Sequence, residues 1–354
     1  MDVQDSSPKR LAARPKPSPA ERHRTRVERL KRLDVGKLRE KVLGALKAEW
    51  DDGRSPDRIL IRRSFARLEQ GLPEGTFSDR KLPPRNKRPP ATRLISPTGS
   101  ALETYLTAVF VAQCITAPGG RPRNDRPVVY RSADRSGLRP WSDLIAMPTV
   151  RRTGAGRTFS SLEDNRVRQF DGTLKRLAAD DVRLVELPNA HKPKAKYEGF
   201  ILLDEVGDPE RASSVRYRVP RSGEAVFGLP PAFFLNGWHM VLSDSELALL
   251  LSVLAHAGRA EAWPSELTVQ LDGATRIRFH GLSLDTYAAH RYLAAFGLLE
   301  VVPDPNRRPD GTVEGQQEGV RLIPHQLRVV EAGFEKKAQS VVMGQLQGMR
   351  TTKL

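Results

Sequence analysis

Apolar residues at helical spacing mark the first part of the chain that can form regular structure. A helix over residues 37–50 is indicated by an apolar face made of Leu38, Val42, Leu43, Leu46 and Trp50. Residues 57–70, DRILIRRSFARLEQ, predict a second helix. We therefore expect residues 37–70 to form a small helical hairpin.

Two flanking stretches lack such a pattern because proline and basic residues interrupt them. Residues 1–36 mix prolines with arginines and are too polar to bury a core, which predicts a disordered basic arm. Six prolines between Pro73 and Pro97 lie among arginines and lysines. Residues 71–94 should therefore form an extended basic linker.

After this linker, two stretches begin with the same helix-start signature. Ser100–Glu103 and Ser243–Glu246 each read Ser-x-x-Glu, a capping box, and each precedes a nearly continuous apolar run. We expect a buried helix after each box. The proline-rich residues 206–227 indicate a boundary or a crossing strand, which separates a domain over 95–205 from one over 228–335. A closing helix is expected to run to about residue 347.

The two halves agree beyond these helices. Trp141-Ser-Asp-Leu144 in the first half parallels Trp263-Pro-Ser-Glu-Leu267 in the second, and each predicts a short helix. A longer helix then follows in each half, with Ser-Leu at its start and Leu-Ala-Ala near its end. Each of these helices precedes a β-type run, a loop rich in proline and cations, and a second β-type run.

This order of helix, short helix, helix and hairpin resembles the winged-helix fold, in which a hairpin wing follows the third helix. The phrase Leu293-Ala-Ala-Phe-Gly-Leu-Leu-Glu300 looks like the end of a bacterial winged-helix recognition helix running into its first wing strand. Two such modules in one chain of 354 residues are similar to plasmid replication initiators, and the resemblance covers about residues 95–335. It implies an α+β fold, mainly helical, with two tandem winged-helix domains.

The net charge of +16 is concentrated at the front of the chain. Residues 1–94 contain 25 Lys and Arg against 13 Asp and Glu, a balance of +12, whereas residues 206–354 contain 16 of each kind. Such a front can neutralise phosphates and release counterions, so nucleic acid is the first candidate partner, ahead of an anionic membrane surface. The alternative is a basic tail that only keeps the protein soluble.

The first module carries most of the candidate DNA contacts. Its helix over residues 160–178 has an apolar face opposite a polar and basic one, as a recognition helix requires. The loop over residues 189–197 contains several lysines and no acid, which suits contact with phosphates or the minor groove. The residues expected to contact DNA in this module are Ser161, Asn165, Arg168, Gln169, Lys175, Arg176, Lys192, Lys194 and Lys196.

The second module is nearly neutral. Its helix is expected to present Tyr287, His290 and Arg291 outward, and its wing carries Arg307 and Arg308 beside acidic residues. Such a face suits weak DNA reading or a dimer seam. In the initiators that the chain resembles, the second winged helix often binds DNA strongly. The stronger charge of the first module here departs from that family pattern.

The chain lacks the motifs of the common catalytic and metal sites. No apolar run is long enough to span a bilayer, and the first residues lack a signal-peptide stretch. The histidines form no HExxH motif, and no GxxxxGK[ST] phosphate loop occurs. Cys114 lies in an apolar run and reads as a core residue. We therefore expect a cytoplasmic protein, associated with plasmid or nucleoid, that is no enzyme and needs no metal or cofactor.

Together with the resemblance, these features predict a double-stranded DNA-binding protein that serves a plasmid or mobile element as replication initiator or autoregulator. Its candidate partners are duplex DNA, a second copy of the chain and replication proteins, with no membrane. The alternative is a protein-interaction scaffold whose winged-helix-like modules dock proteins while the basic arm tethers it to nucleic acid. RNA is less favoured because only 6% of the residues are aromatic.

Overall fold

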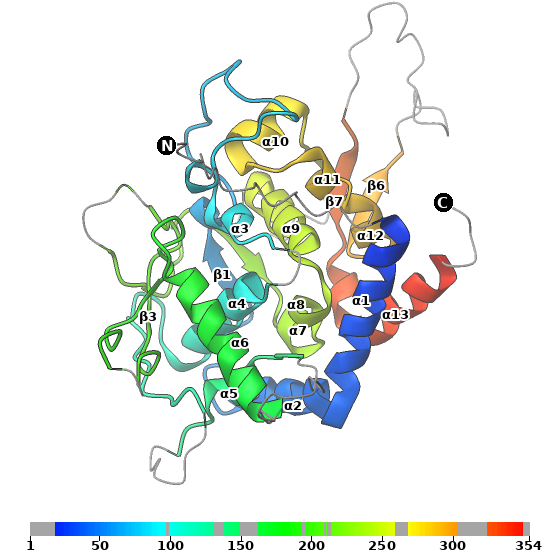
Figure 1. Ribbon diagram of the computed structural model, residues 1–354. Coiled ribbons are helices and arrows are strands. Elements are labelled where there is room, and N and C mark those ends of the chain that lie inside the picture. The colour runs from blue at the N-terminus through cyan, green and yellow to red at the C-terminus, as the bar shows by residue number, and fades with distance from the viewer. Residues whose placement is uncertain are drawn as a thin grey trace, which may run out of the picture.

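Two apolar helices, α4 (Ala101–Ile115) and α9 (Asp244–Ala257), form the centre of the molecule (Figure 1). Every residue of α4 from Ala101 to Cys114 is buried, and α9 is buried from Glu246 to Ala255. Both helices confirm what the apolar runs predict. The computed structural model describes residues 18–96, 99–129, 137–148, 162–192, 195–208, 210, 214–258, 268–303 and 324–349.

Within the described residues the architecture is α+β, with many helices and three small antiparallel sheets. The other helices are α1 (Pro19–Asp34), α2 (Leu38–Asp51), α3 (Pro90–Arg93), α5 (Trp141–Leu144), α6 (Leu162–Leu177), α7 (Pro231–Leu235), α8 (Trp238–Val241), α10 (Gly273–His280), α11 (Leu284–Tyr287), α12 (His290–Ala295) and α13 (Ala338–Met349). The strands are β1 (Ile59–Arg62), β2 (Val185–Glu186), β3 (Ile201–Leu202), β4 (Val226–Leu229), β5 (Val269–Gln270), β6 (Leu299–Val302) and β7 (Gln326–Val329).

The predicted helical hairpin over residues 37–70 is only half right. α2 forms as expected, with Leu38, Val42 and Leu46 buried. The second helix is replaced by β1, which pairs antiparallel with β4. Ile59 and Ile61 are buried in the core, and the residues between and after them are only partly buried. Isoleucine is β-branched and packs well in a strand, so pairing with β4 stabilises this segment more than a helix would.

The two predicted linkers are packed into the fold. Within residues 71–94, the Leu72 N–H donates to the carbonyl of Arg278 (3.1 Å) and all four residues of α3 are buried. The end of residues 206–227 already belongs to β4, the strand that pairs with β1. The buried apolar residues from Leu30 to Leu346 consequently form one continuous cluster, to which both halves contribute.

Part of the predicted disordered arm is also an ordered helix, α1. Ser18 accepts from the Glu21 N–H (3.2 Å), and the Glu21 carboxylate accepts from the Ser18 N–H (2.7 Å), which completes a capping box. Leu30 and Leu33 are 1% exposed and anchor the helix against the rest of the core. The prediction of disorder failed because a few apolar residues are enough to hold a mainly polar helix when they pack against a core formed by the rest of the chain. Residues 1–17 lie outside the described part.

Only one of the two predicted capping boxes after the linker forms. Ser243 and Glu246 cap α9 reciprocally. At α4 the Ser100 side chain makes no cap hydrogen bond and instead lies 2.9 Å from the Thr173 hydroxyl. The helix still begins there, because its burial does not depend on the cap.

The second half departs from its predicted elements in two places, and two further predicted elements fall on residues that are not described. The expected long helix from Ser283 is divided into α11 and α12, and Ser283 caps α11 through the Thr286 N–H (3.0 Å). The expected closing helix begins later, at Ala338, because residues 326–329 form β7 between β5 and β6. The expected short helix at 263–267 and most of the expected strand over 319–324 lie outside the described residues.

Candidate nucleic-acid interface

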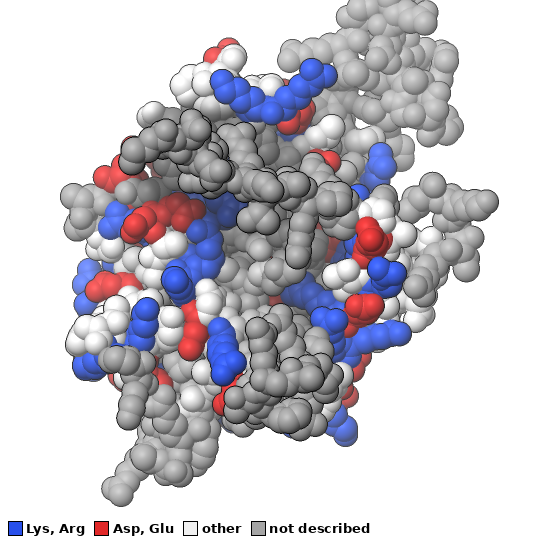
Figure 2. Space-filling model, viewed as in Figure 1, with Lys and Arg blue, Asp and Glu red and all other residues white. Residues whose placement is uncertain are grey.

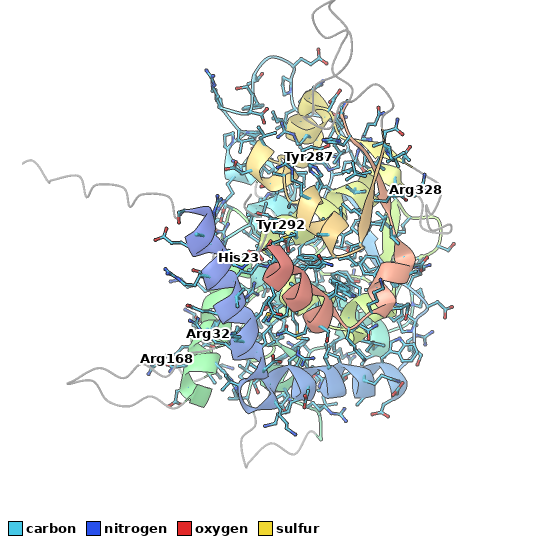
Figure 3. The ribbon with its side chains drawn as sticks, turned by 90° about the vertical axis from the view of Figure 1, so that its right-hand side faces the viewer. His23, Arg32, Arg168, Tyr287, Tyr292 and Arg328 are labelled. Carbon is cyan, nitrogen blue, oxygen red and sulfur yellow. The ribbon has the colours of Figure 1, made fainter. Side chains whose placement is uncertain are left out.

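Helix α6 presents the basic face that its spacing predicts. Phe170, Leu174 and Leu177 are at most 2% exposed and attach α6 to the core. Arg168 and Lys175 lie on the opposite face and are exposed. Figure 3 shows Arg168 at the outer edge of the molecule. Within the described residues these two cations form no ion pair, and the exposed Asp164, four residues before Arg168, lies on the same face.

The flanks of this face are less accessible. Asn165 and Gln169 are half-buried at its side. Arg176 donates to both carboxylate oxygens of Asp181 (2.6 and 2.8 Å) and to the Arg93 carbonyl (3.1 Å). The hydrogen bond from Arg176 lowers the pKa of the Asp181 carboxyl. Arg176 therefore holds the end of α6 against Asp181 and the backbone of Arg93, and its charge is already shared with Asp181.

The lysine-rich loop after β2 lies against α6. The Asn189 side chain donates to the Glu198 carbonyl (2.9 Å) and closes the loop. Lys196 lies 5.5 Å from the centre of the Tyr197 ring and interacts electrostatically with Asp171 of α6, whose pKa is raised chiefly by burial. Lys192 is exposed. Ser161 and Lys194 lie outside the described residues.

The expected outward face of the second half is only partly exposed. Arg291 is exposed, but His290 is 6% exposed, and burial lowers its pKa. Tyr287 is half-buried, with the Arg276 guanidinium 5.8 Å from its ring centre. His290 lies on the buried side, four residues after Thr286 and three before Leu293, whereas Tyr287 stands at the border of the buried and exposed sides. Arg307 and Arg308 lie outside the described residues.

Several cations at the front of the chain hold the fold together. Arg26 of α1 donates to both carboxylate oxygens of Glu246 (2.5 and 2.7 Å) and packs over the rings of Tyr292 and Phe296. Arg29 lies 3.4 Å from Glu103. The positive front is therefore not wholly available to a polyanion. On the face that Figure 2 shows, basic and acidic side chains are interspersed.

Sequence reasoning missed α1 and its inward arginines. The signal was present, because Ser18-Pro-Ala-Glu21 is the same Ser-x-x-Glu signature that we recognised at two later helices. Leu30 and Leu33 add the apolar stripe. Which arginines turn inward depends on acids far along the chain, and no spacing rule identifies those partners.

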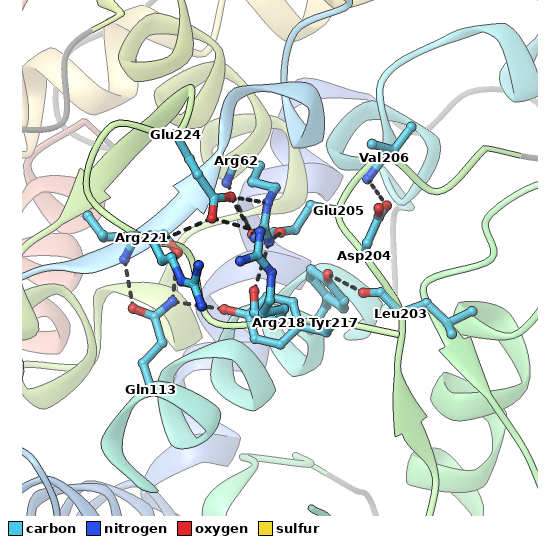
Figure 4. Close-up of polar contacts among 12 residues, drawn as sticks. Arg62, Gln113, Leu203, Asp204, Glu205, Val206, Tyr217, Arg218, Arg221 and Glu224 are labelled. Carbon is cyan, nitrogen blue, oxygen red and sulfur yellow. Dashed lines mark hydrogen bonds and ion pairs between the residues drawn. The ribbon is translucent and has the colours of Figure 1, made fainter. Parts of the chain in front are cut away.

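A second cluster of charged residues, beneath β1, is fully occupied by internal contacts (Figure 4). Arg62 donates to Glu205 (2.5 Å) and to Glu224 (2.9 Å), and Arg218 donates to Glu224 as well (3.0 Å). Glu205 is 0% exposed, and burial raises its pKa even with Arg62 beside it. Two carboxylates so close together can suggest acid–base catalysis, but Glu205 cannot meet a dissolved substrate. Through these contacts the cluster joins Arg62 of β1 to Glu205 and Glu224, which precede β4 in the chain.

Within the described residues, no three His, Cys, Asp or Glu side chains gather in a way that could hold a metal ion. The described helices include none with the length and apolar character needed to cross a membrane. Comparison of the chain with protein-family models, with curated proteins and with solved structures finds no match.

Proposed function

We propose that this protein binds double-stranded DNA through α6 and the loop that follows β2. The observation that carries the proposal is the division of α6 into a face buried through Phe170 and Leu174 and a face that exposes Arg168 and Lys175. A helix of this kind can enter the major groove while a neighbouring basic loop meets phosphates.

The order of elements supports a winged-helix interpretation of both halves. In the first half, α4, α5 and α6 precede the β2–β3 hairpin. In the second half, α9 and α10 precede the divided helix α11–α12, which is followed by β6 and β7, and β7 lies between β5 and β6. By analogy with tandem winged-helix proteins, the biological role would be that of a replication initiator or autoregulator of a plasmid or mobile element.

A protein-docking role is the second candidate, and the second half favours it. Leu284 is 58% exposed, and it shares the outer surface of α11 and α12 with Asp285, Ala288 and Arg291. This surface has no excess of positive charge, so it suits a protein better than a phosphate backbone.

Charge reversal on α6 tests the proposal. The full chain carrying Arg168→Glu and Lys175→Glu should bind a duplex of the DNA flanking its own gene at least tenfold more weakly than the parent does. The salt dependence of its binding should also be shallower, because fewer counterions are released. Fluorescence anisotropy across a salt series measures both effects.

The matched control reverses two exposed lysines outside the candidate interface, Lys41 in α2 and Lys336 before α13. Lys41→Glu with Lys336→Glu makes the same change in net charge. Equal weakening by the two double variants would attribute binding to overall charge and remove α6 from the proposal. Absence of duplex binding by the parent chain would favour the docking role.

A further inference from the structure

Gly172 occupies an unusual place on α6. It is exposed, it lies well inside the helix, and a Cβ built on it would meet no atom within 4 Å. Glycine inside a helix is destabilising relative to alanine, and no contact within the described protein requires it here. Packing therefore does not explain the glycine.

The residues around Gly172 on the helix surface indicate why a glycine is suited to this position. Arg168 precedes it by four residues and Lys175 follows it by three, so the two cations flank the glycine on one helix face. They are seven residues apart, about 10 Å along the helix axis. Within the described residues neither cation forms an ion pair. Asp171, on the edge of this face, is half-buried beside Lys196, and Asp164, four residues before Arg168, is the exposed acid of the face.

Other helix glycines in open space lack this arrangement. Gly44 of α2 has Glu40 four residues before it, and the lysine three residues after it, Lys47, is paired with Asp51. In α13, Gly344 has Ser340 and Gln347 at the same two positions, and Gly348 has Gly344 four residues before it. Among these four glycines, only Gly172 therefore has a cation four residues before it and an unpaired cation three residues after it.

We infer that Gly172 is the point at which the sugar–phosphate backbone of a nucleic-acid duplex approaches α6 most closely, with Arg168 and Lys175 bound to phosphates on either side. The inference rests on the proposed function and assigns a residue to it. A side chain at position 172 would hold the duplex away from the helix surface and lengthen both cation–phosphate contacts. The occupant is an anionic backbone because both flanking groups are cations and an apolar partner would leave them unpaired.

The test is Gly172→Gln, a neutral substitution that favours the helix, in the full chain with the same duplex. We expect at least fivefold weaker binding, together with an unchanged or higher melting temperature, because the residue has free space in the unbound protein. Gly172→Ala should show a smaller loss of affinity. Gly344→Gln should raise or preserve the melting temperature in the same way and leave the affinity unchanged.

The outcomes separate this inference from the function on which it rests. If Gly172→Gln binds as tightly as the parent while Arg168→Glu with Lys175→Glu weakens binding, Gly172 is not the approach point and the proposed interface stands. If the parent chain does not retain the duplex, both are overturned. Equal losses from Gly172→Gln and Gly344→Gln would also reject the inference, since the loss would then be general.

Discussion

Replacing Arg62 by methionine should destabilise the protein by about 3–5 kcal/mol, the usual cost when one partner of a buried ion pair is removed. Glu205 is 0% exposed, and the Arg62 side chain lies 2.5 Å from its carboxylate. Without the guanidinium, the carboxylate must either remain charged in the interior or take up a proton, and either outcome costs free energy of folding. Chemical unfolding in urea at pH 7 measures the change in the free energy of unfolding.

Two variants show whether the loss comes from the uncompensated carboxylate. Arg62→Met combined with Glu205→Gln should recover part of the stability, because the remaining buried group is then neutral. Lys47→Met removes one half of an exposed pair with Asp51 and should cost less than about 1 kcal/mol. A cost for Arg62→Met no greater than that for Lys47→Met would show that the buried pair does not stabilise the fold.

The second large effect should appear in the dependence of stability on pH. Glu103 is 2% exposed beneath α1, and burial raises its pKa to about 8 despite Arg29 nearby. A carboxyl whose pKa is higher in the folded state than in the unfolded state stabilises the protein while it is protonated. Its contribution is complete below its ordinary pKa of 4.5 and is lost as the pH rises through about 8.

Glu103→Gln removes this titration and keeps the shape of the side chain. Relative to the parent, the variant should gain stability steadily between pH 5 and pH 8, by a total on the order of 3–4 kcal/mol for a shift of this size. Thermal unfolding of both proteins across that range gives the difference directly. Asp244, whose pKa burial raises to about 7, is present in both proteins, and its charge also raises the pKa of Glu103.

An exposed acid on α1 provides the control for this prediction. Glu28 pairs with Arg32 at the helix surface, 3.5 Å apart. The stability of Glu28→Gln should therefore depend on pH in the same way as that of the parent. Parallel profiles for Glu103→Gln and the parent would contradict the burial of a titrating carboxyl under α1. If both variants gained stability relative to the parent as the pH rises, the cause would be the change in net charge and not the burial of Glu103.

The elements that the sequence predicted correctly are those whose signals are local. α4 and α9 follow from long apolar runs, and α6 follows from the spacing of Phe170, Leu174 and Leu177. The exposure of Arg168 and Lys175 follows from the same spacing, because a helix with one face buried must turn the other outward. This part of the candidate interface therefore needed no tertiary information.

The elements that were predicted wrongly depend on distant partners. The residues of β1 have an acceptable helical spacing, and only β4, more than 160 residues later, makes them a strand. Arg176, Arg26 and Arg29 look like cations available to DNA until Asp181, Glu246 and Glu103 are brought beside them. A charge count cannot distinguish a cation that faces solvent from one that neutralises a buried acid.

The sequence by itself therefore determined the two central helices, the basic outer face of α6 and the excess of positive charge, since each depends on residue types at fixed local spacing. The tertiary structure alone decided that α1 packs against the core, that the predicted linkers carry paired strands and buried residues, and that Arg26, Arg29 and Arg176 pair with acids from other parts of the chain. The physical reason is that these outcomes depend on contacts between residues far apart in the chain, whose stabilisation exists only once both partners are in place.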